Sequence, residues 1–260
     1  MLDSLAKYYA ENGISAVGFD CRHGRIGHGL CRLKSRDFVS AREAFVGSEY
    51  EKGTLPRVLF VSIDAASDHP GREPSKRTLE YMRYWEENGK SPPDGCNPNV
   101  LNKNQHWYRT HEFAHGLLSL VANEKGITPF LFKDIHRYFA HTNSAKCKDA
   151  AGGSKQGQRW MFDNCRPFIR PEIELLRPDV LVTQGDWGHK SVDGQFPIDR
   201  VIAWSDRPEY KCEIIRIADR KVLRFRLYHP RRFGPFNKQR REAYQWYFAV
   251  ARDFFEEGSE

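Results

Sequence analysis

Residues 57–64 read RVLFVSID, a short apolar run that ends at Asp64. A continuous apolar run of this length is typical of a strand that is buried on both faces of a parallel sheet. Similar runs lie within residues 127–143, at 180–185 and at 222–230, and segments with helical periodicity separate them. This alternation predicts an α/β fold of three α/β/α layers around a central four-stranded parallel sheet.

The length and pattern of the chain predict one domain over residues 1–260. It has no internal repeat and no low-complexity linker, and a long polar segment at about 65–104 predicts an insertion or lid. Helices are expected near residues 1–13, 77–87, 110–126, 160–179 and 241–257.

Several features predict a cytoplasmic, monomeric protein without membrane contact. No stretch approaches the roughly 20 apolar residues that span a bilayer. The N-terminus lacks the basic start and apolar block of a signal peptide. The net charge of +7 and the pI of about 9.1 favour a polyanionic partner such as DNA.

Polar side chains mark the ends of the four predicted strands: Asp64, Asn143, Gln184 and His229. Ligands of parallel sheets bind beyond these carboxyl ends. An amide suits the Watson–Crick edge of a base, a carboxylate orients water or stabilises positive charge on a sugar, and an imidazole donates to a leaving group that becomes an anion. For each residue alone a capping or loop role is the better interpretation, but the ordered combination predicts cleavage of an N-glycosidic bond.

The chain has six cysteines, at positions 21, 31, 96, 147, 165 and 212. A disulfide framework is not expected in a cytoplasmic protein. Cys212 lies in the strand-like KCEIIRIA and is expected to be a buried small hydrophobe. Cys21, Cys31 and Cys147 lie in polar segments, which favours a ligand role for them.

Two stretches, TNSAKC at 142–147 and NCRPFIRPEIELLRPDVLVTQG at 164–185, resemble the iron–sulfur branch of the uracil-DNA glycosylase superfamily. That branch has an Asn-x-x-Lys-Cys motif, a second cysteine, a helix and a strand that ends in glycine. PRVLFVS at 56–62 and YHPRRFG at 228–234 resemble its first and last catalytic motifs. The resemblance covers roughly residues 21–236 and implies a uracil-DNA glycosylase-like fold.

The resemblance also implies a structural [4Fe–4S] cluster held by Cys21, Cys31, Cys147 and Cys165. The first pair departs from the family, which usually has Cys-x-x-Cys, because nine residues separate Cys21 from Cys31. The glycine-rich insert can loop out between them. Two alternatives stay open: Cys96 replaces one ligand, or a set of cysteines with His23 or His28 binds zinc.

The first catalytic motif departs further, since residues 62–66 read SIDAA where the branch has Gly-Glu-Ala-Pro-Gly. Asp64 falls where the best-known uracil-excising branch has its water-positioning aspartate. Two residues later that branch has a tyrosine that blocks substituents at pyrimidine C5, and this chain has Ala66. We expect the pocket to accept a C5-enlarged cytosine, such as the hydroxymethylated or glucosylated cytosine of some phage DNA, with uracil as the alternative.

The remaining site residues follow from the same resemblance. His229 matches the histidine of the last motif, and Asn143 reads the base. Trp107 or Tyr108 is expected to stack on the base. DNA contacts are expected from Lys146, Lys148, Arg231 and Arg232, and Phe233 is expected to wedge into the gap that a flipped base leaves.

The sequence therefore predicts a monofunctional DNA glycosylase that flips a pyrimidine nucleotide and leaves an abasic site, in anti-phage defence or in repair. One alternative is an ordinary uracil-DNA repair glycosylase. Another is a non-catalytic iron–sulfur DNA-binding module, which the departure at Ser62 and Ile63 favours. A zinc nuclease is disfavoured because the chain has no HxH or HExxH spacing.

Overall fold

The computed structural model describes residues 1–25, 27, 29–63, 73–81, 83, 106–124, 126, 131–149 and 158–257. Four residues with predicted roles lie outside this part of the chain: His28, Asp64, Ala66 and Cys96. So do most of the predicted insertion and the second half of the helix expected at 77–87, apart from residue 83. None of the described helices is both long enough and apolar enough to cross a membrane.

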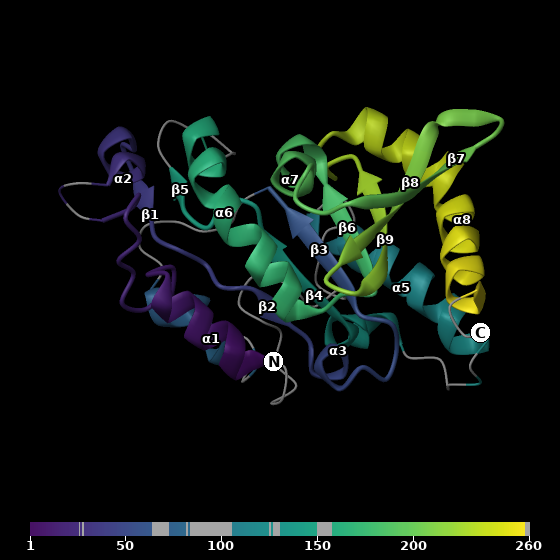
Figure 1. Cartoon of the computed structure of the whole chain (residues 1–260), viewed down its shortest axis with the longest axis horizontal. Coiled ribbons are helices and arrows are strands. Elements are labelled where there is room, and N and C mark those ends of the chain that lie inside the picture. Colours follow the sequence, from purple (N-terminus) through teal and green to yellow (C-terminus); the bar gives the residue numbers. More distant parts are fainter. Residues whose placement is uncertain are drawn as a thin grey trace.

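The described residues form a seven-stranded mixed sheet in the order β2-β4-β3-β6-β9-β8-β7 (Figure 1). In this order the strands span Phe45–Val46, Phe139–Asn143, Val58–Ser62, Val180–Gln184, Arg220–Leu227, Arg207–Ile217 and Ile198–Trp204. The strands β4, β3, β6 and β9 pair in parallel, whereas β2, β8 and β7 pair antiparallel with their neighbours. The predicted α/β class is confirmed, but the predicted central four-stranded parallel sheet is not, because the sheet is mixed, has seven strands and carries antiparallel strands at both edges.

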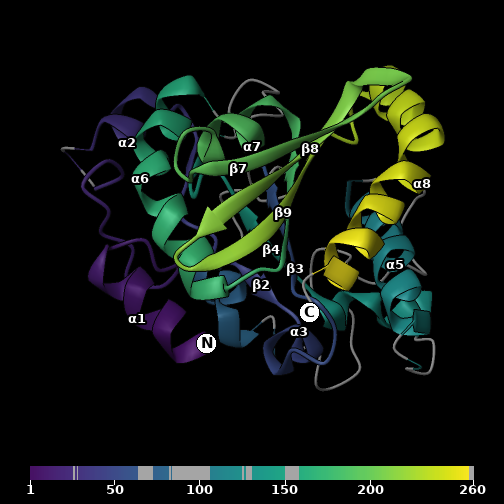
Figure 2. The ribbon, with the colours of Figure 1, turned by 45° about the vertical axis from the view of Figure 1, so that its right-hand side comes forward.

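Helices cover both faces of this sheet (Figure 2). Helices α5 (His106–Glu124) and α8 (Phe233–Glu257) cover one face, and α1 (Leu2–Glu11) and α6 (Arg159–Leu176) cover the other. Successive side chains of a strand point to opposite faces. Phe60 accordingly packs towards α5, while Leu59 and Val61 pack towards α6.

Three short elements complete the side of the molecule near α6. The two-residue strands β1 (Phe38–Val39) and β5 (Lys148–Asp149) pair antiparallel with each other. The short helix α2 (Leu30–Lys34) precedes them. These elements surround the loop that follows β4, which is the loop with the predicted cysteine motif.

A buried ion pair holds that loop against the helices. The Lys146 ammonium is 1% exposed and binds both Glu172 on α6 and the hydroxyl of Thr142. Tyr9 of α1 also donates to Glu172. Contrary to the sequence-based expectation, Lys146 does not present its charge to DNA, because the ammonium lies inside the protein. Lys148 is buried as well, within β5.

We expect Lys146→Met to lower the free energy of unfolding by about 3–5 kcal/mol, because it leaves Glu172 buried and unpaired. The double variant Lys146→Met/Glu172→Leu should recover much of that loss, because apolar replacement of a buried pair is often close to neutral. Urea unfolding at constant slope measures both. Lys7→Met is the control, because it removes an exposed lysine that pairs with Glu11. Equal stabilities of Lys7→Met and Lys146→Met would contradict the buried pair.

Candidate active site

The parallel strands bring four polar residues together at their carboxyl ends. Ser62 ends β3, Asn143 ends β4 and Gln184 ends β6. Ser62 and Asn143 are direct register partners, and His229 follows β9, which pairs with β6. The strand ends of the sequence-based prediction therefore lie side by side, except that Asp64 lies outside the described residues.

A buried hydrogen-bond network centres on Ser62. Its hydroxyl donates to the Gln184 carbonyl oxygen at 2.7 Å. This bond uses the only proton of the Ser62 hydroxyl, so the 2.8 Å contact with Nε2 of His141 must be donated by His141 Nε2–H to the Ser62 oxygen. Nε2 of His106 lies 2.7 Å from the same Gln184 oxygen and 3.1 Å from the Ser62 oxygen, so it also carries a proton. We call these four side chains, Ser62, His106, His141 and Gln184, the floor of the site. Their polar groups form hydrogen bonds with one another.

The histidines of this floor are neutral near pH 7. Burial lowers the pKa of His106 to about 4, although its bond to Gln184 acts in the opposite direction. Burial, together with His106 and nearby cations, holds the pKa of His141 well below its usual value. Neither residue was predicted from the sequence. His141 shares a strand face with Asn143, which was a usable signal, whereas nothing local in the sequence places His106 beside Ser62.

His229 lies at the open side of this floor, with its ring centroid 4.9 Å from that of His106. Nδ1 of His229 accepts the backbone N–H of Arg231 at 3.2 Å. Burial, with His106 and Arg231 as further causes, lowers the pKa of His229 to about 3. His229 is therefore a neutral imidazole with its proton on Nε2, where it can donate to a ligand.

A cavity of about 390 Å³ opens beside His229, and its lining includes Ile63, Trp187 and Tyr228. Among the described residues that line it, the cations Lys190, Arg231 and Arg232 outnumber the carboxylate of Asp186, so this part of the rim is positive. The predicted contacts Arg231 and Arg232 thus lie together at this cavity, whereas Lys190 was not predicted. Phe233 is the first residue of α8 and is 51% exposed next to them.

The predicted base-pocket residues differ in their placement. Asn143 is 4% exposed, and within the described residues its side-chain amide has no hydrogen-bond partner. Trp107 packs behind the floor, 4.5 Å from the ring of His141. Tyr108 packs on Phe132 at 5.4 Å. Neither aromatic ring is among the residues that line the cavity beside His229.

The four predicted cluster ligands, Cys21, Cys31, Cys147 and Cys165, are all buried free thiols. They come from three separate parts of the chain, and each is close enough to the others to influence their ionisation. Burial first, and then the neighbouring thiols, raise the pKa of Cys147 well above its usual value, and burial raises the pKa of Cys165 to about 12. The four thiols thus come from separate parts of the chain into one region, and their role as cluster ligands stays a prediction.

Two donors already point at these sulfurs. The backbone N–H of Lys146 donates to Sγ of Cys165 at 3.3 Å, and the amide of Asn164 donates to Sγ of Cys31 at 3.2 Å. In the described part of the chain, no three histidine, cysteine or acidic side chains are grouped tightly enough to hold a single metal ion. Cys212 is buried in β8, as predicted.

Comparison with known protein families finds no family that matches this chain, and no curated protein matches it. Function is therefore inferred from the motifs and from the geometry described above.

Gly185 packs against His229 so closely that a side chain would not fit. It begins α7 (Gly185–Val192) at φ +78°, and a Cβ there would lie 2.8 Å from Cβ of His229 and 3.2 Å from Cδ1 of Ile63. Only glycine combines this backbone conformation with this close approach.

We expect Gly185→Ala to cost about 2–5 kcal/mol of unfolding free energy, the sum of left-handed strain and overlap in a packed site. It should also shift the NMR signals of the His229 ring. Gly18→Ala is the matched control, because Gly18 has φ +73° and a Cβ added there would have no atom within 4 Å. The control carries the strain alone and should cost less. Equal losses, with unshifted His229 signals, would contradict the close packing.

Proposed function

We propose that the protein is a monofunctional DNA glycosylase that flips a pyrimidine nucleotide and hydrolyses its N-glycosidic bond. The observation that carries this proposal is His229: a neutral imidazole, fixed as an Nε2–H donor, beside a cavity with a positive rim. The parallel order β4-β3-β6-β9, with helices on both faces, also supports a uracil-DNA glycosylase-like fold.

The proposed chemistry uses His229 as a fixed dipole. When the bond between the sugar and the base breaks, the base leaves with the electron pair and becomes an anion. A neutral Nε2–H donor stabilises that charge without first giving up its proton. Water then adds to the anomeric carbon of the oxocarbenium-like sugar and loses one proton, while solvent protonates the base. The carboxylate expected to orient this water is Asp64, which lies outside the described residues.

Asn143 is suited to recognise the flipped base. Its amide offers a donor and an acceptor together, which matches the Watson–Crick edge of a pyrimidine. Asn143 ends β4 directly beside Ser62, at the ends of the parallel strands where ligands of such sheets bind. This position favours a base-reading role over an ordinary loop role.

DNA is the proposed partner, and the cations at the cavity are proposed to hold its phosphates. Arg231 and Arg232 are exposed beside His229, and the exposed ring of Phe233 follows them at the start of α8. From the sequence, with Ala66 at the position that would block C5, we propose a C5-enlarged cytosine of phage DNA as the preferred base and uracil as the second. Anti-phage defence is the corresponding role.

We also propose that the four buried thiols hold a [4Fe–4S] cluster. Thiolate sulfur is the usual ligand of such clusters, and N–H donors to the sulfurs tune them. Cluster thiolates stand further apart than the ligands of one ion, because irons and sulfides lie between them. When bound, the cluster would supply cross-links between loops, and we assign it no step in base excision.

The excision proposal is tested with duplex and single-stranded DNA that carries uracil, 5-hydroxymethylcytosine or its glucosylated form. Wild type should produce abasic sites with at least one of these bases. His229→Gln and Asn143→Ala should each lower the single-turnover rate by about 10²–10³, as loss of one preorganised group typically does. His136→Gln is the matched control, because His136 lies in the 3₁₀ helix Phe132–Tyr138 that precedes β4, at the opposite end of that strand.

The pH dependence checks the protonation state in this experiment. With its folded pKa near 3, His229 stays neutral from pH 8 to 5, so the rate should show no step near pH 6.5. Below about pH 6.5 the unfolded chain protonates His106, His141 and His229, whereas the folded chain does not, so the free energy of unfolding falls as the pH drops. Rates are therefore measured above pH 5. A step near 6.5 that His229→Gln removes would refute the neutral donor. DNA binding without abasic sites would favour the non-catalytic module.

The cluster is tested by metal analysis of protein that was produced without oxygen. We expect a brown protein with about four irons and four sulfides per chain. Cys147→Ser should lose iron, sulfide and stability together, because cluster binding is coupled to folding. Cys212→Ser is the control, since Cys212 is buried in β8, away from the four thiols, and should keep the iron. One zinc per chain without iron would overturn the proposal.

A further inference from the structure

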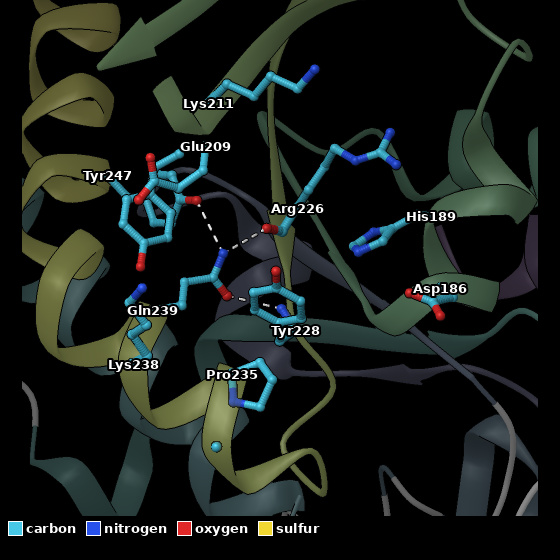
Figure 3. A pocket seen from close by; sticks show the side chains of 12 residues that line it. Asp186, His189, Glu209, Lys211, Arg226, Tyr228, Pro235, Lys238, Gln239 and Tyr247 are labelled. Atoms are coloured by element: carbon cyan, nitrogen blue, oxygen red, sulfur yellow. Dashed lines mark hydrogen bonds between the residues drawn. The ribbon is translucent and has the colours of Figure 1, made fainter. Parts of the chain in front are cut away.

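A second cavity, of about 470 Å³, lies next to the cavity of His229 (Figure 3). We call it the flank pocket, and the residues that give it its character are Asp186, Glu209, Lys211, Arg226, Tyr228 and Lys238. It lies between α7, the ends of β8 and β9, and the first turns of α8. Asp186 and Tyr228 line both cavities, so the two cavities adjoin on the side of the sheet where the parallel strands end.

The floor of the flank pocket is fixed by hydrogen bonds. Gln239 is 4% exposed, donates to the backbone oxygen of Arg226 at 3.1 Å and to the Tyr247 hydroxyl at 3.2 Å, and accepts the N–H of Tyr228 at 2.9 Å. The Arg226 guanidinium in turn binds Asp193 at 2.7 Å. A floor held in this way exists before a ligand arrives, which lowers the entropic cost of binding.

The walls of the flank pocket carry charges of both signs around the exposed ring of Tyr228, whereas the other two tyrosines of the lining, Tyr210 and Tyr247, are buried. Lys211 and Lys238 are exposed, and neither ammonium pairs with a carboxylate of the described residues. Glu209 and Asp186 are exposed carboxylates on the opposite sides of the pocket (Figure 3). The ring of Tyr228 is 39% exposed.

This combination matches the parts of a nucleotide. Ammonium groups bind phosphate, a tyrosine ring stacks on a base of any identity, and carboxylates accept the N–H of an exocyclic amine. The volume is also within the range of small-ligand sites, about 300–1,000 Å³. A free phosphate would use only the lysines and would leave the Tyr228 ring and the carboxylates of Glu209 and Asp186 without a partner.

We propose that the flank pocket binds an unpaired nucleotide adjacent to the target nucleotide in the same strand. This inference rests on the proposed function, since it takes DNA as the partner and His229 as the target site. A stacked neighbour in this pocket cannot remain paired, because its base is inserted between protein side chains. The preferred substrate is therefore single-stranded or locally opened DNA, and a neighbour with an exocyclic amine is preferred over thymine.

The test measures binding by fluorescence anisotropy with short single strands. The target nucleotide carries a 2′-fluorine, which withdraws electrons from the anomeric carbon and blocks excision. Three strands are compared. The first has nucleotides on both sides of the target, the second lacks those on the 5′ side, and the third lacks those on the 3′ side. Each binds wild type, Lys211→Ala/Lys238→Ala and the control Lys7→Ala/Lys221→Ala. The control loses the same charge at exposed lysines of α1 and of the opposite end of β9.

We expect wild type to lose about tenfold in affinity on one truncation, the side whose neighbour occupies the flank pocket. The Lys211→Ala/Lys238→Ala variant should bind the full strand about tenfold more weakly than wild type does. Its affinity should fall little further on that same truncation, because the truncation and the substitutions remove the same contact. Equal losses of this variant on all three strands, or a loss no larger than that of the control, would overturn the inference. So would a wild-type protein that binds none of the strands.

The two proposals fail in different ways. If wild type shows the one-sided pattern but produces no abasic sites in unfluorinated strands, the glycosylase proposal fails and the flank pocket stands. If wild type excises bases, while the losses of affinity from truncation and from the lysine substitutions add up, the flank-pocket proposal fails and the glycosylase proposal stands.

Discussion

The parallel register of β3 with both β4 and β6 is the constraint on which the site depends. All five residues of each of these strands are buried, so the strand ends are largely shielded from water. Polar groups at such ends need partners inside the protein. Ser62, His141, Gln184 and His106 supply one another with hydrogen bonds, and this closed network leaves the Asn143 amide and the His229 donor for a ligand.

The site separates neutral groups from charged ones. Burial lowers the pKa of His106, His141 and His229 and keeps these histidines neutral, while the cations Lys190, Arg231 and Arg232 lie at the rim. A polyanion is attracted to these cations, whereas the neutral histidines offer hydrogen bonds to an uncharged ligand. A protonated histidine in the interior would repel the adjacent histidines and Arg231, which is why the geometry favours hydrogen-bond donation over proton transfer.

The sequence was sufficient for the parts of the fold that local patterns determine. Four apolar runs predicted β3, β4, β6 and β9, because strands buried on both faces have an unbroken apolar signature. β7 was missed because most of its residues face solvent. The role of Lys146 was misassigned, and that of His106 was missed, because each depends on a partner far along the chain, Glu172 and Ser62 respectively.

The residues around Asn143 connect the cysteines with the end of β4, where we propose that a base is recognised. Lys146 uses two groups at once: its backbone N–H binds Cys165 on α6, and its ammonium binds Glu172 on the same helix. Thr142, directly before Asn143 in β4, bonds to both Glu172 and Lys146. The strand end that presents Asn143 is therefore anchored on both sides by the helix that carries a thiol. A ligand of the cysteines that moved α6 would move Asn143 with it, so a structural cluster there would determine how precisely a base is read.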